Sequence, residues 1–185
     1  RHGLPERTRQ QMRTALGNGA RRLMELSVPS GTDSALFETL LAEYNADYAA
    51  HCRIETAPYP GVAALLRTLH TQGRKLAIVS NKPDEAVRAL RADFFADAVQ
   101  IAVGETAAIR RKPAPDMLLA AMEQLGADPD KTVFVGDSEV DIATARAADL
   151  PCISVLWGFR DRDVLERAGA QQFAADIAQL QALLG

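Results

Sequence analysis

The chain has 185 residues, of which 48% are apolar and 24% are charged, and its formal net charge is −3. This composition is typical of a globular protein with one sizeable core, or a core domain with a small appendage. The charge balance offers no basic surface for nucleic acid, and no apolar run is long enough for a membrane span. No secretory signal opens the sequence, and Cys52 and Cys152 lack metal-ligand spacing. We therefore expect a cytoplasmic protein with reduced thiols, whose oligomeric state the sequence does not indicate.

The first third of the chain is predicted to be helical. Helices are expected over 5–16, with Pro5 in the first turn, over 19–26, and over 32–52, where apolar residues recur at helical intervals. The Pro58–Gly61 stretch then marks a boundary. We expect a helical domain over residues 1–57 and a second domain over residues 58–185.

Short apolar runs alternate with helical patterns in the rest of the chain. The predicted helices span 61–73, 84–92, 114–126, 139–148, 162–169 and 176–184, and the predicted strands span 75–80, 98–103, 132–136, 152–156 and 171–175. This alternation predicts an α/β fold with a doubly wound parallel sheet. In such sheets, ligands bind beyond the carboxyl ends of the strands.

Polar residues follow two of these strands. Ser80 ends the strand over 75–80 and Asn81 and Lys82 follow it directly, where a hydroxyl and free backbone N–H groups suit a phosphate oxygen. Lys112 precedes two prolines that stiffen its loop, so it could present a fixed positive charge to a phosphoryl group. Taken alone, the first cluster is better explained as a helix cap, whereas the second is equally consistent with a solvated lysine.

An acidic pair follows the strand over 132–136. Asp137 comes after Gly136, and Asp141 lies one helical turn further on, so the two carboxylates could share a direction. Hard oxygen ligands of this kind suit Mg²⁺ together with a substrate phosphate. The alternative is a capped helix start with solvated acids, in which Glu139 complements the helix dipole. A hydroxyl, a lysine and an acidic pair at successive strand ends favour phosphoryl transfer.

The stretches "VSNKP", "KPAPD" and "VGDSEVDIATARAA" resemble the second, third and fourth motifs of the haloacid dehalogenase superfamily, and most closely its phosphoglycolate phosphatase group. The resemblance extends to "WGFR" at 157–160 and implies a Rossmann-like core with a small α-helical cap over the first third. The "GNGA" stretch at 17–20 is similar to the substrate-facing loop of that cap. With Arg21, its residues Asn18 and Gly19 are therefore candidates for substrate binding.

The resemblance also implies roles for the residues at the strand ends. Ser80, helped by the Asn81 backbone, would hydrogen-bond the phosphoryl group, and Lys112 would neutralise its charge. Asp137 would bind Mg²⁺, and Asp141 would ligate the metal or orient its water shell. The implied activity is a Mg²⁺-dependent phosphatase that acts on a small phosphorylated metabolite, such as 2-phosphoglycolate, through an aspartyl-phosphate intermediate.

One motif of that superfamily is missing. The Asp-x-Asp-Gly-Thr loop, which carries the nucleophile and the general acid/base, does not occur in the 185 residues, and Asp33 and Asp47 lie in helical segments. In this fold the missing strand would lie between the strands over 75–80 and 132–136. We therefore expect the native protein to carry roughly 25–35 further N-terminal residues, a number taken from usual element lengths.

Two other activities remain as alternatives. A sugar phosphomutase shares these motifs, and a non-catalytic module that binds phosphate and Mg²⁺ would need no nucleophile. Phosphonate cleavage requires a lysine in the cap, whereas the first lysine of the chain is Lys75.

Overall fold

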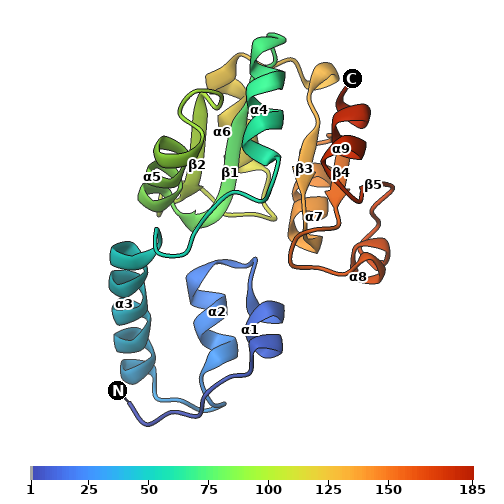
Figure 1. Cartoon of the computed structure of the whole chain (residues 1–185). Helices are drawn as coiled ribbons and strands as arrows, with labels where there is room; N and C mark the ends of the chain where they lie inside the picture. The colour runs from blue at the N-terminus through green and yellow to red at the C-terminus, as the bar shows by residue number, and fades with distance from the viewer. Residues whose placement is uncertain (1) are drawn as a thin grey trace. The chain divides into compact units, whose positions relative to one another are not determined.

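The computed structural model describes residues 2–185 and shows two compact units, Arg1–Thr56 and Ala57–Gly185. The described part of the first unit contains helices only, whereas strands and helices alternate along the second (Figure 1). The α/β fold class predicted from the sequence is confirmed.

The helices of the first unit are α1 (Arg9–Ala15), α2 (Gly19–Ser27) and α3 (Ser34–His51). The prediction that the first helix starts at Pro5 is wrong, because Thr8 caps it. Thr8 Oγ1 accepts the Gln11 N–H at 3.2 Å, and Gln11 Oε1 accepts the Thr8 N–H at 2.9 Å. These two reciprocal bonds satisfy backbone donors at the helix end and so fix its first residue.

The elements of the second unit follow the predicted alternation. They are α4 (Val62–Thr71), β1 (Ala77–Pro83), α5 (Asp84–Phe94), β2 (Ile101–Glu105), α6 (Asp116–Leu125), the 3₁₀ turn η1 (Pro129–Lys131), β3 (Phe134–Gly136), α7 (Glu139–Ala147), β4 (Cys152–Val155), α8 (Arg162–Arg167), β5 (Gln172–Ala174) and α9 (Ile177–Leu184).

The strands form two parallel sheets. In one sheet β1 pairs with β2, and in the other β4 lies between β3 and β5 (Figure 1). The parallel pairing is as predicted, but among the described residues β1 and β3 do not pair, so one continuous sheet is not formed. The further strand expected between them stays a prediction.

The end of β1 also differs from the prediction. The strand was expected to end at Ser80, with Asn81 and Lys82 beyond it, yet all three residues lie within β1, where the pairing with β2 becomes irregular between Val79 and Pro83. Beyond Val79 regular pairing stops until Pro83 faces Glu105. The irregular stretch of β1 therefore carries the residues expected to meet the ligand.

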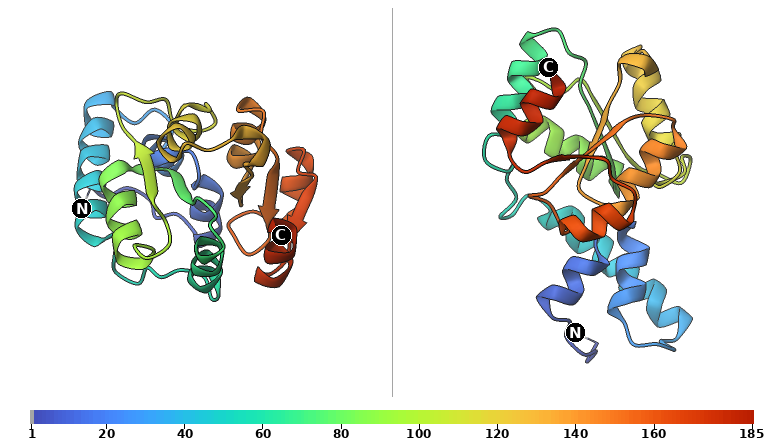
Figure 2. Two further views of the ribbon diagram at one scale, coloured as in Figure 1. Left: turned by 90° about the horizontal axis from the view of Figure 1, so that it is seen from above. Right: turned by 90° about the vertical axis from the view of Figure 1, so that its right-hand side faces the viewer.

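Helices pack against both sheets (Figure 2). Helices α5 and α6 contact β1 and β2, α7 contacts β3 and β4, and α9 contacts β5. One cluster of buried side chains joins α4, β4, β5 and α9, and it consists of Leu65, Leu69, Ile153, Val155, Ala174 and Leu180. Burial of such apolar side chains supplies most of the favourable free energy of folding.

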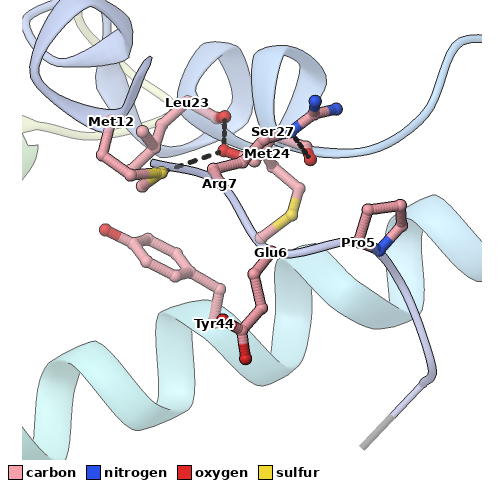
Figure 3. A pocket seen from close by; sticks show the side chains of 8 residues that line it. All are labelled: Pro5, Glu6, Arg7, Met12, Leu23, Met24, Ser27 and Tyr44. Carbon is pink, nitrogen blue, oxygen red and sulfur yellow. Dashed lines mark hydrogen bonds between the residues drawn. The ribbon is translucent and has the colours of Figure 1, made fainter. Parts of the chain in front are cut away.

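A shallow hollow of about 370 Å³ lies within the first unit, where Met12, Leu23, Met24 and Tyr44 supply much of its lining (Figure 3). None of the candidate site residues lines it. Across residues 2–185, no helix combines the length and the apolar character that spanning a bilayer would require.

Candidate active site

Asn81 on β1 holds the backbone of Lys112. Its Nδ2 donates to the Lys112 carbonyl at 3.0 Å, and its Oδ1 accepts the Lys112 N–H at 2.9 Å. Asn81 is 7% exposed, so both bonds are shielded from water. A planar amide that makes both bonds fixes the position and the direction of the lysine backbone. The family resemblance implied that the Asn81 backbone helps to bind the phosphoryl group. The Asn81 side chain makes a different contact, to the backbone of Lys112.

The Lys112 side chain connects β1 with α7. Its Nζ donates to the Val79 carbonyl on β1 at 3.3 Å and to Asp141 Oδ1 on α7 at 2.6 Å. The side chains of Lys112 and Asp141 are only 11% and 7% exposed. A buried ammonium group is costly unless it is paired and hydrogen-bonded, and these contacts meet that requirement.

Asp141 is held at both carboxylate oxygens. While Oδ1 accepts from Lys112, Oδ2 accepts the backbone N–H of Asp137 at 3.2 Å and of Ser138 at 3.1 Å, and the Ser138 hydroxyl at 2.6 Å. Ser138 in turn caps α7, in a capping box whose third helical residue is Asp141. The predicted helix cap is therefore present, but Asp141 is buried rather than solvated, and the same bonds hold it beside Lys112.

Asp137 lies between β3 and α7 and is half-buried. Its Oδ2 accepts the Phe159 N–H at 2.7 Å, and within residues 2–185 its Oδ1 accepts no hydrogen bond. Of the two acids, Asp137 thus has the more available carboxylate oxygen.

Ser80 is adjacent to Val79 and Asn81, which both contact Lys112. The Ser80 hydroxyl accepts the Lys82 N–H at 3.2 Å, a local bond typical of a turn. The structure thus brings Asn81, Lys112, Asp141 and Asp137 into one chain of contacts, with Ser80 next to it in sequence.

The donor set limits what kind of cation could bind. In the part of the chain that the structure describes, no group of three or more His, Cys, Asp or Glu side chains is arranged to hold a metal ion. Mg²⁺ commonly takes one or two carboxylates and completes its shell with water and substrate phosphate. The Oδ1 atom of Asp137 fits that kind of site as a single protein ligand, whereas the oxygens of Asp141 are already engaged.

The residues predicted to bind substrate from the helical region lie around the start of α2. Asn18 is its N-cap residue and makes no side-chain capping bond, and Gly19 has φ of +78°. Arg21 forms a bidentate pair with Glu38, at 2.8 and 2.9 Å, and its guanidinium lies over Phe37. These residues belong to the first unit, and Arg21 is engaged there within the unit.

Two residues that contact the candidate site were not predicted from the sequence. Ser138 donates to Asp141, and the Ser-x-x-Asp spacing of a capping box could have indicated this contact. Arg160 forms a bidentate pair with Glu139, at 2.7 and 3.0 Å. The separation of 21 residues leaves no local pattern that predicts this pair.

The family model of the haloacid dehalogenase-like hydrolases matches residues 2–149, which is most of the chain. The chain belongs to this family. The match includes Ser80, Lys112, Asp137 and Asp141, whereas Phe159 and Arg160 lie beyond it.

Curated relatives carry different substrate names. The chain is 35% identical, over 83% of its length, to the phosphoglycolate phosphatase of Rhodospirillum rubrum, of which the alignment covers 64%. It is 31% identical, over 85% of its length, to the N-acetylmuramic acid 6-phosphate phosphatase of Pseudomonas aeruginosa, of which 70% is covered. The chain thus spans about two thirds of the length of these relatives.

Solved structures share the fold over nearly the whole chain. A candidate phosphoglycolate phosphatase from Lactobacillus delbrueckii subsp. bulgaricus superposes with a TM-score of 0.89 and 34% identity, covering 96% of this chain and 83% of that one. Protein tyrosine kinase A of Mycobacterium tuberculosis superposes with a TM-score of 0.77 and 26% identity, covering 98% and 83%. Similar folds therefore serve proteins with different activities.

Proposed function

We propose that this protein is a Mg²⁺-dependent phosphomonoesterase that acts on a small phosphorylated metabolite in the cytoplasm. The observation that carries the proposal is the buried Lys112, whose Nζ is held between Val79 O on β1 and Asp141 Oδ1 on α7. A fixed cation at this place would stabilise the negative charge on a phosphoryl group during transfer.

Each residue has a distinct task in this proposal. Ser80 hydrogen-bonds a phosphoryl oxygen, and Asn81 positions Lys112 through its two backbone bonds. Asp137 holds Mg²⁺ through Oδ1, and Asp141 orients Lys112 and the backbone of residues 137 and 138. When bound, Mg²⁺ neutralises phosphate charge and aligns the phosphoryl group.

The aspartyl-phosphate route needs a carboxylate nucleophile that the described site does not supply. Asp33 caps α3 by accepting the N–H groups of Ala35 and Leu36, and Asp47 lies on α3 beside His51. Neither is at the end of a strand. Neither Asp33 nor Asp47 is therefore the nucleophile in this proposal.

Several metabolites are consistent with the proposal. 2-Phosphoglycolate and N-acetylmuramic acid 6-phosphate are suggested by the names of the relatives. A sugar phosphomutase would return the phosphoryl group to a sugar and release little inorganic phosphate. A non-catalytic module would bind phosphate without turnover.

The decisive experiment measures phosphate release from these two substrates and from p-nitrophenyl phosphate, with and without Mg²⁺, by the protein encoded by the complete reading frame. Lys112→Met and Asp137→Asn should each lower kcat at least about a hundredfold, because each removes a group that meets the transferring charge. Asp163→Asn, which breaks an exposed pair with Arg167, is the matched control and should leave kcat unchanged. Full turnover by Asp137→Asn, or equal rates without Mg²⁺, would contradict the proposal.

A further inference from the structure

The segment 157–160, which follows β4, contacts the Asp137 side chain closely. The Phe159 N–H donates to Asp137 Oδ2 at 2.7 Å. A Cβ atom added at Gly158 would lie 2.5 Å from Asp137 Cγ, and even closer to its Cβ and Oδ2. Only glycine therefore lets the backbone come this close to the carboxylate.

An ion pair ties the same segment to α7. Arg160 Nε donates to Glu139 Oε2 at 2.7 Å, and Arg160 Nη2 donates to Glu139 Oε1 at 3.0 Å. The Arg160 side chain is only 9% exposed, whereas the ion pairs formed by the residues of α8 lie at the surface. Two parallel bonds between a guanidinium and a carboxylate fix orientation as well as distance, and a lysine cannot reproduce them.

The start of α7 and the segment 157–160 both lie next to Asp137. Glu139 is two residues after Asp137 at the start of α7, and Arg160 is next to Phe159, which binds the Asp137 carboxylate. The pair thus links the two segments that meet at Asp137. Loss of the pair would free the segment 157–160 to move away from Oδ2.

We propose that Glu139 and Arg160 form a positioning pair that holds the segment 157–160 against Asp137 and thereby fixes the direction of the Asp137 carboxylate. Neither residue is catalytic in this account, because each acts through Phe159 and Asp137. The consequence for Mg²⁺ binding rests on the proposed function, whereas the effect on the Phe159 N–H does not.

The direct test is hydrogen exchange of the Phe159 amide, followed by NMR in the metal-free protein. Arg160→Lys keeps the charge but loses the bidentate geometry, and Glu139→Gln keeps the shape but loses the charge. Each should speed exchange of the Phe159 N–H about tenfold, the effect of weakening one hydrogen bond to a charged group. Arg162→Gln, which breaks the exposed Arg162–Glu166 pair on α8, is the control and should leave this exchange rate unchanged.

Gly158→Ala gives a second and independent perturbation. It should displace the segment from Asp137 and speed exchange at Phe159, although Glu139 and Arg160 are intact. Urea unfolding of each variant shows whether the rest of the fold is retained. Unchanged Phe159 exchange in both Arg160→Lys and Glu139→Gln would overturn the proposal, and so would a rise that merely matches exchange across the whole of α7.

Calorimetric titration with Mg²⁺ and steady-state kinetics extend the test to the metal. Arg160→Lys should weaken Mg²⁺ binding several-fold and lower kcat, with KM little changed, because the phosphate ligands at Ser80 and Lys112 are untouched. If no form of the protein releases phosphate, the proposed function fails, yet faster exchange at Phe159 still supports the positioning pair. If phosphate is released but Phe159 exchange stays constant, only the positioning pair fails.

Discussion

Individual residues at the strand ends hold one another through polar contacts. Asp141 receives four hydrogen bonds, and its partner Lys112 is fixed by the Asn81 amide as well as by the Val79 carbonyl. Because these groups are buried, loss of any one partner leaves another polar group without water to replace it. Single substitutions of these residues should therefore have measurable effects on stability.

Asn81→Ala should lower the free energy of unfolding by about 2 kcal/mol, because the N–H and C=O groups of Lys112 both lose a buried partner. Urea denaturation measures this change. The control is Gln100→Ala, since Gln100 Oε1 accepts the Leu76 N–H at an exposed position of the same unit. We expect the control to cost less than about 1 kcal/mol, and equal losses in the two variants would argue against a clamp at Lys112.

Cys152 should be a slow nucleophile. Burial, and next the negative charge of Asp141, raise the pKa of its thiol to about 11, although Lys112 and Ser154 oppose the rise. At pH 8 its alkylation by iodoacetamide should be about a hundredfold slower than that of an ordinary thiol, because only the thiolate reacts. Peptide mapping by mass spectrometry separates Cys152 from Cys52. The rate should climb with pH beyond pH 9, and a plateau below that pH would contradict the raised pKa.

At the scale of elements, the start of α7 combines a helix cap with the site. Ser138 caps the helix and also donates its hydroxyl to Asp141 Oδ2 at 2.6 Å. Thr8 has the same capping role in α1, but at an exposed position and with no link to the predicted site residues. The two caps therefore form a natural pair for comparison.

Ser138→Ala should cost about 2–3 kcal/mol, the sum of a lost cap and a lost buried hydrogen bond to a carboxylate. Thr8→Ala should cost about 1 kcal/mol, the usual effect of removing a cap alone. Thermal or urea unfolding of both variants measures the difference. If Thr8→Ala proves as costly as Ser138→Ala, the additional role of Ser138 is refuted.

For the whole molecule, acid should destabilise the fold. Hydrogen bonds from arginines lower the pKa of Asp116, through Arg110, and of Glu38, through Arg21. Burial by itself would raise the pKa of Glu139, but the bonds and charge of Arg160 together with a backbone bond outweigh it, so this pKa is lowered as well. Such carboxylates bind protons more weakly in the folded than in the unfolded state.

The stability that these acids contribute is present in full above their ordinary pKa values, 4.5 for Glu and 3.8 for Asp, and is lost as the pH falls through the lower folded values. Urea unfolding between pH 3 and pH 7 should therefore show a free energy of unfolding that declines below about pH 4.5. Glu139→Gln should make the decline shallower, because one of the three groups no longer titrates. A decline of equal steepness in this variant would contradict the assignment.

The local sequence determined the alternation of helices and strands and the polar residues near the strand ends. These features depend on residues a few positions apart, so apolar periodicity and capping spacing predict them. The same reasoning misplaced the start of α1, because a cap at Thr8 prevailed over the proline signal at Pro5.

Which of those polar residues contact one another depends on the tertiary structure. Asn81 and Lys112 are 31 residues apart, Lys112 and Asp141 are 29 apart, and the Glu139–Arg160 pair spans 21 residues. Contacts over such separations arise when strands and helices pack into one core, and no local pattern encodes them. For this reason the acidic pair of "VGDSEVD" was visible in the sequence, whereas the different hydrogen-bond partners of Asp137 and Asp141 depend on their neighbours in space.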